Sequence, residues 1–360
     1  MKNRGLETMK AIILAAGYAT RMYPLTKDKP KALLPIGGKV MLDYLMDEVA
    51  TIREIDTVYI VTNSRFAGQF SAWAEEAAAR YPRLALDVLD DGTDSNENRL
   101  GAVGDIRFVL DHRPVDDDLL VAASDNFFTF PLKDMVDDFK AHGRDTLLGQ
   151  HLGWVEDLKR FAVATLDENA RVTALVEKPQ QPPTDVGIYA LYLYKRETVP
   201  LIYQYLDEGN PPDAPGHFPE WLYRRKEVGV YLFEGECVDI GTPPAYREVC
   251  GRLARMEVIT LLRHILKKPE LFLGEQNMQR LKTFLDGYLI CGKQHHLALD
   301  NSWDFQNYAE WKYQAQGARD WTTILRERCV SEKEAFDLLG RLLNEYEKEA
   351  NQPHPAWRKG

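Results

Sequence analysis

Two basic side chains follow a glycine-containing turn near the start of the chain. The stretch LAAGYATR, residues 14–21, comes directly after the apolar run 11–13, and Lys31 follows a little further on. A turn that ends a buried strand exposes backbone N–H groups that can hold phosphate oxygens. Arg21 could bind a phosphate through two parallel hydrogen bonds, and Lys31 through a point charge. The turn contains neither GK[ST] nor GxGxxG, so by itself it is also consistent with an ordinary strand–helix turn.

A longer stretch around this turn resembles a known signature. Residues 14–39, LAAGYATRMYPLTKDKPKALLPIGGK, are similar to the pattern GxGTRxxPxTxxxPKxLxP of the sugar-phosphate nucleotidyltransferases, the family of glucose-1-phosphate thymidylyltransferase. The sequence departs from this pattern at Ala19, where the family usually has a second glycine, and the extra methyl group is expected to restrict the loop. The resemblance implies that the loop binds the nucleotide through Leu14, Ala15, Ala16, Gly17, Tyr18, Ala19, Thr20 and Arg21.

Two aspartates further along resemble the metal ligands of the same family. Asp125 ends the apolar run of VAASDNFF and resembles the GDN motif, with Ser124 in place of its glycine, and Asp239 in VDIGTP resembles the D-x-GT motif. The resemblance implies that Asp125 and Asp239 together bind Mg²⁺, with Asn126 beside the substrate. Mg²⁺ prefers a few carboxylates together with substrate oxygens and water. An isolated Asp at a strand end is more often a cap or a turn residue.

A third motif implies a site for the second substrate. Glu177 and Lys178, in VEKP, resemble the family's contact with a sugar 1-phosphate: the lysine pairs with the phosphate, and the glutamate accepts hydrogen bonds from sugar hydroxyls. Ala162 resembles a position where the family places a glycine against the sugar. We expect Gly187 and Tyr189 to lie near the same wall.

The stretch DDGTDSNENRLGAVGDI lies where the family reads the base. Asn96 and Gly101 are candidate nucleotide contacts, but the stretch lacks the glutamine of the thymidylyl- and uridylyltransferases, so the base stays undetermined. An ordinary polar loop leading into a helix is an equally good interpretation for any single residue here. The Asp-Asn pair after Ser124 favours a thymidylyltransferase-like enzyme.

The resemblance implies an in-line attack by a sugar 1-phosphate oxygen on the α-phosphorus of a nucleoside triphosphate, with release of pyrophosphate. Mg²⁺ on Asp125 and Asp239 would contact the α-phosphate, Arg21 the leaving pyrophosphate and Lys31 the reacting phosphates, while Lys178 would steer the nucleophile. Such chemistry needs positioning and charge neutralisation more than a general base, because a phosphate monoester is already anionic.

Two other functions stay open on the sequence. One is transfer of a cytidylyl group to phosphocholine or another phosphorylated alcohol, since related enzymes share the opening motif. The other is a regulatory protein that binds a nucleotide sugar without turning it over. The Glu177-Lys178 motif favours a sugar phosphate, and the intact charged residues argue against a degenerate site.

The apolar pattern predicts the elements that position these residues. Short β-rich runs alternate with helical patterns from residue 10 to about residue 194, which predicts a Rossmann-like α/β domain: a mostly parallel mixed sheet with helices on both faces. Ligands of such sheets bind beyond the carboxyl ends of the strands, so the turn at 14–21 and Asp125 are expected to share one crevice. Residues 161–179 are predicted to form a hairpin, and the proline-rich residues 208–221 a loop.

The end of the chain is predicted to be helical. Residues 257–268 and 331–350 carry apolar side chains on one helix face, and Ser331 with Glu334 forms a capping box. The predicted organisation is an N-terminal extension (1–8), a nucleotidyltransferase domain (9–254), an all-α domain (255–350) and a flexible tail (351–360). The all-α domain resembles small uncharacterised helical proteins, which implies no activity; homo-oligomerisation is one hypothesis for its role.

Composition excludes several classes of protein. The 360 residues carry a net charge of −10, which argues against nonspecific binding of nucleic acid. There is no apolar run of about 18 residues that could span a membrane. The four cysteines form no CxxC pair, which favours reduced thiols and a cytoplasmic protein over disulfides or zinc.

Overall fold

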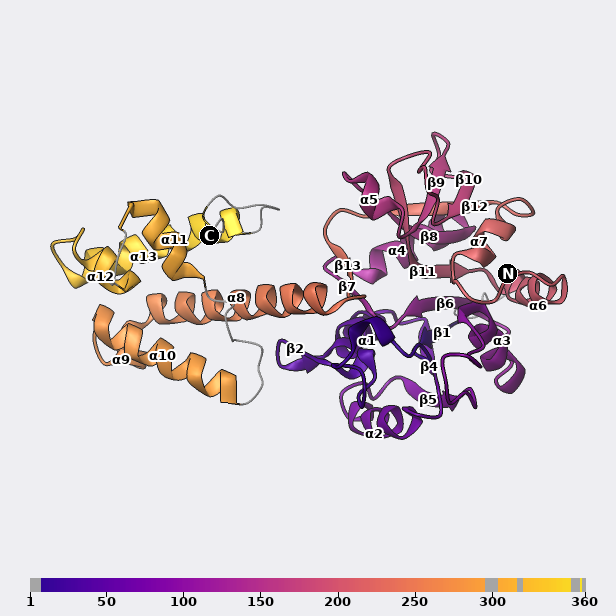
Figure 1. Ribbon diagram of the computed structural model, residues 1–360, viewed down its shortest axis with the longest axis horizontal. Coiled ribbons are helices and arrows are strands. Elements are labelled where there is room, and N and C mark those ends of the chain that lie inside the picture. The colour runs from indigo at the N-terminus through magenta and orange to yellow at the C-terminus, as the bar shows by residue number, and fades with distance from the viewer. Residues whose placement is uncertain (1–7, 295–303, 316–319, 351–356, 358–360) are drawn as a thin grey trace, which may run out of the picture. The chain divides into compact units, whose positions relative to one another are not determined.

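The computed structural model describes residues 8–294, 304–315, 320–350 and 357. The chain forms two compact units (Figure 1). The larger comprises Met1–Leu34 and Val40–Pro243, and the smaller comprises Pro35–Lys39 and Pro244–Gly360.

A nine-stranded sheet forms the centre of the larger unit. Four strands in the order β6–β1–β4–β5 are parallel, and their near-continuous apolar runs suit strands buried on both faces. β11 joins them in antiparallel fashion, next to β6, and leads to β8, β9 and β10. The strands are β1 (Met9–Leu14), β4 (Ile55–Thr62), β5 (Ala85–Asp90), β6 (Asp118–Ala123), β8 (Asp145–His151), β9 (Ala162–Leu166), β10 (Val172–Glu177), β11 (Val186–Tyr194) and β12 (Val228–Leu232).

Helices cover both faces of this sheet, which confirms the predicted fold class. Successive side chains of a strand point to opposite faces, so Ile12 and Ile13 of β1 are both fully buried, in two different core clusters. Ile13 packs in the cluster of α1, α2 and α4, and Ile12 in that of α3, α6 and α7. The helices of this unit are α1 (Met41–Thr51), α2 (Ala67–Ala78), α3 (Ala102–His112), α4 (Leu132–His142), α5 (Val155–Leu158), α6 (Val199–Asp207) and α7 (His217–Leu222).

Part of the proline-rich stretch is helical, so the prediction of a loop over residues 208–221 is wrong at its end. α7 begins at His217 and buries Phe218 and Trp221. Pro219 lies in the first turn of this helix, where a backbone N–H has no partner within the helix, so the proline is tolerated there.

Shorter elements lie outside the main sheet. The predicted hairpin over 161–179 is formed by β9 and β10, which pair antiparallel. A second antiparallel pair joins β7 to β13. The remaining short elements of the chain are β2 (Pro35–Ile36), β3 (Lys39–Val40), β7 (Asn126–Phe128), β13 (Cys237–Asp239) and the 3-10 helices η1 (Thr20–Met22), η2 (Lys31–Leu33) and η3 (Arg196–Thr198).

The smaller unit is helical and has a core cluster of its own, drawn from residues 258–357. In its predicted capping box, Glu334 N donates to Ser331 Oγ (3.2 Å), and the Glu334 side chain accepts from Val330 N (3.0 Å). The predicted boundary at residue 255 falls inside one continuous helix, α8. The helices are α8 (Pro243–Lys267), α9 (Pro269–Leu273), α10 (Met278–Gln294), α11 (Phe305–Tyr313), α12 (Trp321–Arg326) and α13 (Glu332–Ala350).

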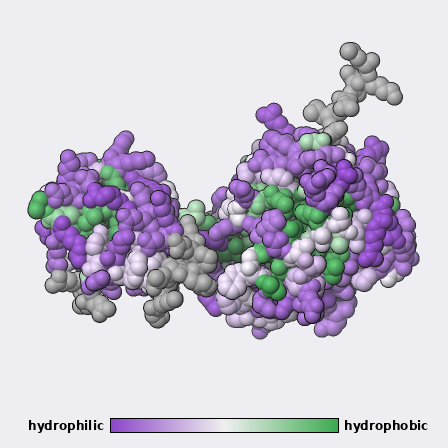
Figure 2. Space-filling model, turned by 90° about the horizontal axis from the view of Figure 1, so that it is seen from above, coloured by the Kyte–Doolittle hydropathy of each residue, from purple (hydrophilic) through white to green (hydrophobic). Residues whose placement is uncertain are grey.

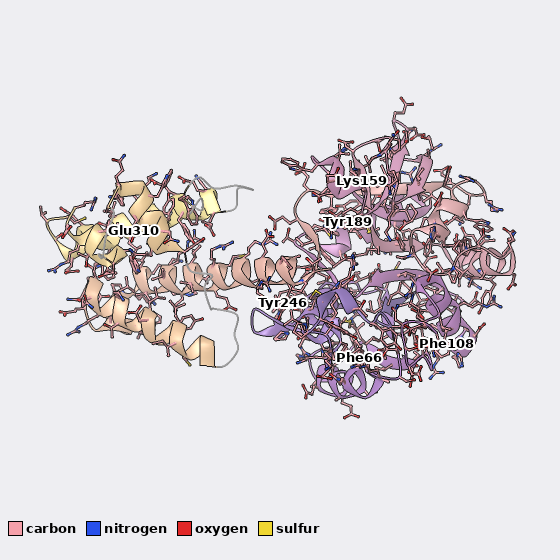
Figure 3. All side chains as sticks on the ribbon, viewed as in Figure 1. Phe66, Phe108, Lys159, Tyr189, Tyr246 and Glu310 are labelled. Carbon is pink, nitrogen blue, oxygen red and sulfur yellow. The ribbon has the colours of Figure 1, made fainter. Side chains whose placement is uncertain are left out.

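A short segment from early in the sequence belongs to this helical unit. The Tyr246 hydroxyl of α8 donates to the backbone carbonyl of Pro35 (Figure 3). Residues 35–39 therefore cluster with α8, although they lie between η2 and α1 in the sequence.

The predicted terminal segments lie almost wholly outside the described residues. Of the extension over 1–8 only Thr8 is described, and of the tail over 351–360 only Trp357. Trp357 is buried against the rings of Tyr308 and Tyr346, because burial of its indole removes a large apolar surface from water. Trp357 is therefore packed against the helical core, which differs from the flexible tail predicted for this position.

The surface gives no sign of a membrane span. In the part of the chain that the structure describes, every helix is too short or too polar to cross a bilayer. Figure 2 shows a face on which hydrophilic side chains cover most of both units, with hydrophobic residues gathered in one area of the larger. All four cysteines carry free thiols.

Candidate active site

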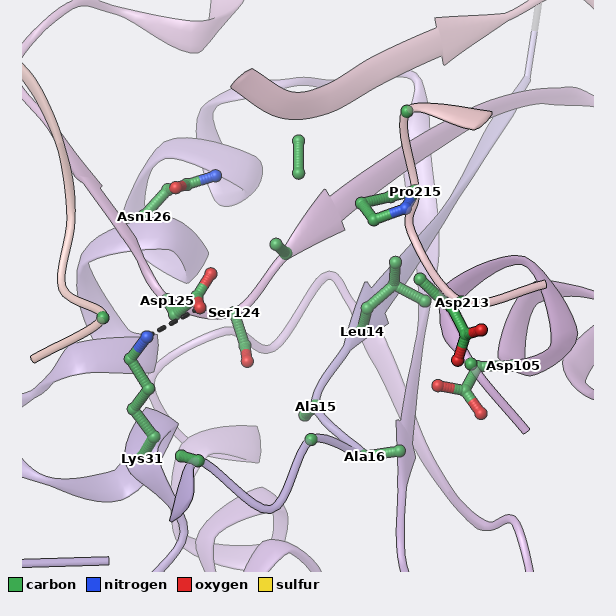
Figure 4. Close-up of a pocket in the computed structure, with 18 of the residues that line it drawn as sticks. Leu14, Ala15, Ala16, Lys31, Asp105, Ser124, Asp125, Asn126, Asp213 and Pro215 are labelled. Atoms are coloured by element: carbon green, nitrogen blue, oxygen red, sulfur yellow. Dashed lines mark hydrogen bonds and ion pairs between the residues drawn. The ribbon is translucent and has the colours of Figure 1, made fainter. Parts of the chain in front are cut away.

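A cavity of about 590 Å³ opens in the larger unit at the carboxyl ends of β1 and β6. Leu14 ends β1, and Ser124 and Asp125 follow β6, so the predicted crevice is formed where these parallel strands end (Figure 4). Most of the predicted site residues line it: Leu14, Ala15, Ala16, Gly17, Tyr18, Ala19, Thr20, Arg21, Lys31, Asn96, Gly101, Asp125, Asn126, Ala162, Glu177 and Lys178.

The turn after β1 is held by backbone and side-chain hydrogen bonds. Ala15 N donates to Val61 O (2.9 Å), and Asn63 Nδ2 donates to Ala16 O (2.8 Å). Ala19 has a left-handed backbone, with φ 47° and ψ 42°, and its carbonyl accepts from Thr26 Oγ1 (2.8 Å). A residue with a side chain adopts this conformation at a cost of about 1 kcal/mol, whereas glycine does not. The predicted restriction of the loop therefore has a backbone cause, since Ala19 occupies a conformation that glycine adopts freely.

Lys31 and Asp125 meet beside this turn. Lys31 Nζ lies 2.7 Å from Asp125 Oδ2, and the lysine side chain is only 11% exposed. η2 presents the lysine and the end of β6 the aspartate, so two groups 94 positions apart in sequence form one ion pair. The exposed side chain of Arg21, in η1, lines the same cavity. This end of the cavity can therefore balance the charge of a polyphosphate.

Of Asp239, the second predicted metal ligand, only the position of the backbone is described. In the β7–β13 pair Asp239 is opposite Asn126, and Ile240 N donates to Asp125 O (3.3 Å). The side chain of Asp239 lies outside the described residues. Among those described, no group of three or more His, Cys, Asp or Glu could hold a metal ion. Mg²⁺ needs no such group when phosphate oxygens and water complete its shell, so the Asp125 carboxylate suits a substrate-completed Mg²⁺ site.

Another part of the cavity carries one acidic and two basic side chains. Lys178 Nζ lies 3.3 Å from Glu177 Oε1; the glutamate side chain is 9% exposed and the lysine 56%. Lys178 has a left-handed backbone, φ 46°, and its N–H donates to Phe161 O (3.1 Å), which turns the chain sharply after β10. Arg160 lines the cavity as well, although the sequence motifs did not identify it. An anion with neighbouring hydroxyl groups suits this combination of one acceptor and two cations.

Close backbone approach fixes the position of Glu177. A methyl group added to Gly216 would lie 2.0 Å from Glu177 Oε2 and 3.3 Å from the Ala162 side chain, so the Glu177 carboxylate would have to move to admit it. Burial, followed by the charge of Glu177, raises the pKa of the nearby Tyr192 phenol well above its usual value. Gly216 and Tyr192 also line the cavity, and neither belongs to a motif that the sequence singled out.

Two predicted substrate contacts, Gly187 and Tyr189, are not among the residues that line this cavity. In β11 it is Ile188, Ala190 and Tyr192 that line it, and the alternation of a strand directs the intervening side chains to the other face. A methyl group on Gly187 would meet the Leu152 side chain at 2.5 Å. The Tyr189 hydroxyl (Figure 3) lies 3.2 Å from Gln150 Oε1 and 3.2 Å from Cys237 O. Neither residue lines the cavity itself, whereas Ile188, which lies between them, does.

A loop and the start of α3 close the remaining part of the cavity. Gly101 caps α3 with φ 82°, and a methyl group there would lie 2.6 Å from Pro212 O. Asn96 is exposed and accepts from the Arg99 guanidinium (3.0 Å), which also lies 3.3 Å from Asp213 Oδ1. Asp105, one turn into α3, lines the cavity and was not identified from the sequence. The signal that could have found it is its place four residues before the buried Val109, on the inward row of the helix.

Comparison with known proteins agrees with this fold. The family model for nucleotidyl transferases matches residues 10–255, and the chain belongs to that family. It is 27% identical over 272 residues to a provisionally assigned mannose-1-phosphate guanyltransferase of Sulfolobus acidocaldarius, covering 74% of this chain and 66% of that protein. It is 29% identical over 186 residues to the glucose-1-phosphate thymidylyltransferase of Streptomyces antibioticus, covering 52% and 49%.

A solved structure shows the same fold. UDP-glucose pyrophosphorylase complexed with UDP-glucose aligns with a TM-score of 0.59 at 20% identity, over 69% of this chain and 99% of that one. The present chain spans about half to two thirds of the length of the two curated relatives described above. The names of these proteins differ in both base and sugar.

Proposed function

We propose that the protein joins a nucleoside triphosphate to a sugar 1-phosphate, giving a nucleoside-diphosphate sugar and pyrophosphate. One observation carries the proposal: Arg21, Lys31, Asp125 and Lys178 line a single cavity, although they come from three distant parts of the sequence. A cavity of about 590 Å³ is within the size range of small-molecule sites.

The residues of this chain would act by positioning and by neutralising charge. A phosphate oxygen of the sugar 1-phosphate attacks the α-phosphorus, the bond from that phosphorus to the bridging oxygen breaks, and pyrophosphate leaves. Lys178 and Arg160 hold the attacking phosphate, with Glu177 accepting from sugar hydroxyls. Arg21 and Lys31 stabilise the charge on the leaving pyrophosphate.

Asp125 and Asp239 are the residues that we propose hold Mg²⁺. When bound, the metal would supply charge neutralisation at the phosphate oxygens. The 2.7 Å pair of Lys31 with Asp125 supports this role, because it positions the Asp125 carboxylate beside the turn that follows β1.

The Glu177–Lys178 motif favours a sugar phosphate over phosphocholine. Glu177 is a nearly buried acceptor beside the lysine, and a sugar has hydroxyl groups to donate to it, whereas phosphocholine has none.

The test is a pyrophosphate-release panel with Mg²⁺, using GTP, ATP, CTP, UTP and dTTP against glucose 1-phosphate, mannose 1-phosphate and phosphocholine. We expect release with a sugar 1-phosphate. Asp125→Asn should lower kcat by about 100- to 1,000-fold, and Lys178→Ala should mainly raise KM for the sugar phosphate by about 10- to 100-fold. Lys159→Ala is the matched control, because this lysine pairs with Glu156 and does not line the cavity.

Three results would contradict the proposal. Near-normal turnover by both cavity variants would remove these residues from the mechanism. Release with phosphocholine alone would identify the cytidylyltransferase alternative. If no combination releases pyrophosphate but a nucleotide sugar binds saturably, the protein is the regulatory alternative.

A further inference from the structure

Asp105 is a buried carboxylate without a partner in the described part of the chain. The residue is 6% exposed, its Oδ1 has no hydrogen bond, and it lines the cavity in the first turn of α3. Burial, and then the neighbouring charge of Asp91, raises the pKa of Asp105 to about 8. Buried polar groups normally find a partner, so this side chain calls for a ligand that donates hydrogen bonds.

A phosphate cannot be that ligand. Asp213 lines the same end of the cavity, and Figure 4 draws it and Asp105 on the opposite side of the view from the Lys31–Asp125 pair. The first amides of α3 are already used, since Ala102 N donates to Asp213 O (3.1 Å) and Val103 N to Pro212 O (2.9 Å). Arg99, the cation at this end, is already paired with Asp213 (3.3 Å), so the triphosphate belongs at the other end, where Arg21 and Lys31 line the cavity.

The nucleobase is the part of the substrate that remains for this end. Leu14 and Pro215 line it with apolar surface, which suits the flat faces of a base ring. Asp105 then faces the ring edge, where N–H donors and carbonyl acceptors distinguish one base from another.

We infer that Asp105 reads the nucleobase and selects guanine: the carboxyl gives up its proton when guanine binds, and its two oxygens accept hydrogen bonds from N1–H and from the exocyclic N2 amine. This inference rests on the proposed function, because it assigns the base of the same triphosphate substrate. Guanine presents two adjacent donors on this edge, whereas thymine and uracil present one donor between two carbonyl acceptors, which an acid-lined pocket repels. Adenine and cytosine present an amine beside a ring acceptor, and so match only one carboxylate oxygen.

The experiment measures binding and turnover of GTP, ITP, XTP, ATP, CTP, UTP and dTTP on the wild-type protein and on Asp105→Asn. ITP lacks the N2 amine of GTP, and XTP has a carbonyl in its place. The substitution replaces two acceptors by one acceptor and one donor, so the new amide opposes the guanine amine and matches the xanthine carbonyl. Calorimetry gives Kd for each nucleotide, and pyrophosphate release gives kcat/KM.

We expect the wild-type protein to bind GTP about 10- to 100-fold more tightly than ITP, and more tightly than the other four natural nucleotides. Asp105→Asn should weaken GTP binding by a similar factor and strengthen XTP binding, with kcat for the best sugar phosphate nearly retained. Asp111→Asn, on the same helix but outside the cavity, is the matched control and should leave the order of nucleotides unchanged.

Failure of this inference is separable from failure of the proposed function. If Asp105→Asn turns over and ranks the nucleotides in the same order of affinity as the wild-type protein, Asp105 does not select guanine, while the proposed transferase activity is unaffected. Equally weakened binding of all nucleotides in Asp105→Asn would make Asp105 a structural residue and would also overturn the inference. If no pyrophosphate is released by any protein, the calorimetric order still decides the role of Asp105.

Discussion

Asp105 and Ala19 are two residues that the fold holds in energetically unfavourable states. Ala19 holds a left-handed backbone that glycine adopts more easily, and Asp105 buries a carboxylate oxygen that has no hydrogen bond in the described structure. A buried acid makes stability depend on pH, because the folded protein holds the proton more tightly than the unfolded chain. With a folded pKa of about 8, against about 3.9 unfolded, the folded protein binds more protons between these values, so its stability falls as the pH rises through them.

The corresponding prediction compares Asp105→Asn with the wild-type protein by urea unfolding at pH 5 and pH 8. The asparagine does not titrate, so the wild-type free energy of unfolding should fall relative to the variant by about 2–4 kcal/mol over this interval. Asp111→Asn, whose side chain is about half exposed, should show no such trend. A difference between Asp105→Asn and wild type that is the same at both pH values would show that Asp105 is ionised throughout.

At the scale of elements, the start of α3 and the loop before α7 are built against each other. Gly101 has φ 82°, its added methyl group would lie 2.6 Å from Pro212 O, and the next two amides donate to residues 212 and 213. The same loop then reaches Gly216, whose lack of a side chain admits Glu177. The Asp105 end and the Glu177 end of the cavity are therefore joined by one short loop.

We predict that Gly101→Ala destabilises the protein by about 2–4 kcal/mol, because a left-handed backbone and a backbone clash coincide. It should also raise KM for the nucleotide, since Arg99 and Asp213 would shift with the loop. Denaturant unfolding and steady-state kinetics measure the two effects. Gly68→Ala in α2 is the control: nothing lies within 4 Å of its added methyl group, and it should be neutral or stabilising by up to about 1 kcal/mol. Equal effects of the two substitutions would contradict this account of Gly101.

At the scale of the whole molecule, each unit buries a core of its own. The two clusters of the larger unit draw on residues 9–233, and the cluster of the smaller unit on residues 258–357. Every residue that lines the cavity belongs to the larger unit. Stability of the helical unit and chemistry in the cavity should therefore be separable by mutation.

Leu339→Ala tests this separation, because Leu339 is fully buried in the helical core. We expect calorimetry to show a loss of about 2–5 kcal/mol confined to one unfolding transition, with kcat/KM for pyrophosphate release unchanged at temperatures where that unit stays folded. Leu271→Ala, at a position that is 75% exposed, should move neither transition. Loss of turnover in Leu339→Ala under folding conditions would mean that the helical unit contributes to the reaction.

The sequence by itself determined the sheet and much of the cavity. Apolar runs such as residues 11–13 can only be buried on both faces, and polar residues that follow such strands must gather at their carboxyl ends. The places of Arg21 and Asp125 after such strands suggested a shared crevice, but Arg21, Lys31, Asp125, Glu177 and Lys178 were identified through the family motifs that they resemble.

Only the tertiary structure decided which side chains enter the cavity and which do not. The register of β11 turned Gly187 and Tyr189 away and brought in Tyr192, because a shift of one residue exchanges the faces of a strand. Arg160 and Gly216 carry no local signal of their own, since their significance depends on elements far away in sequence that pack beside them. Ala19 likewise became meaningful only through its backbone angles: a methyl group that looked like a steric detail marks a strained position in the turn that follows β1.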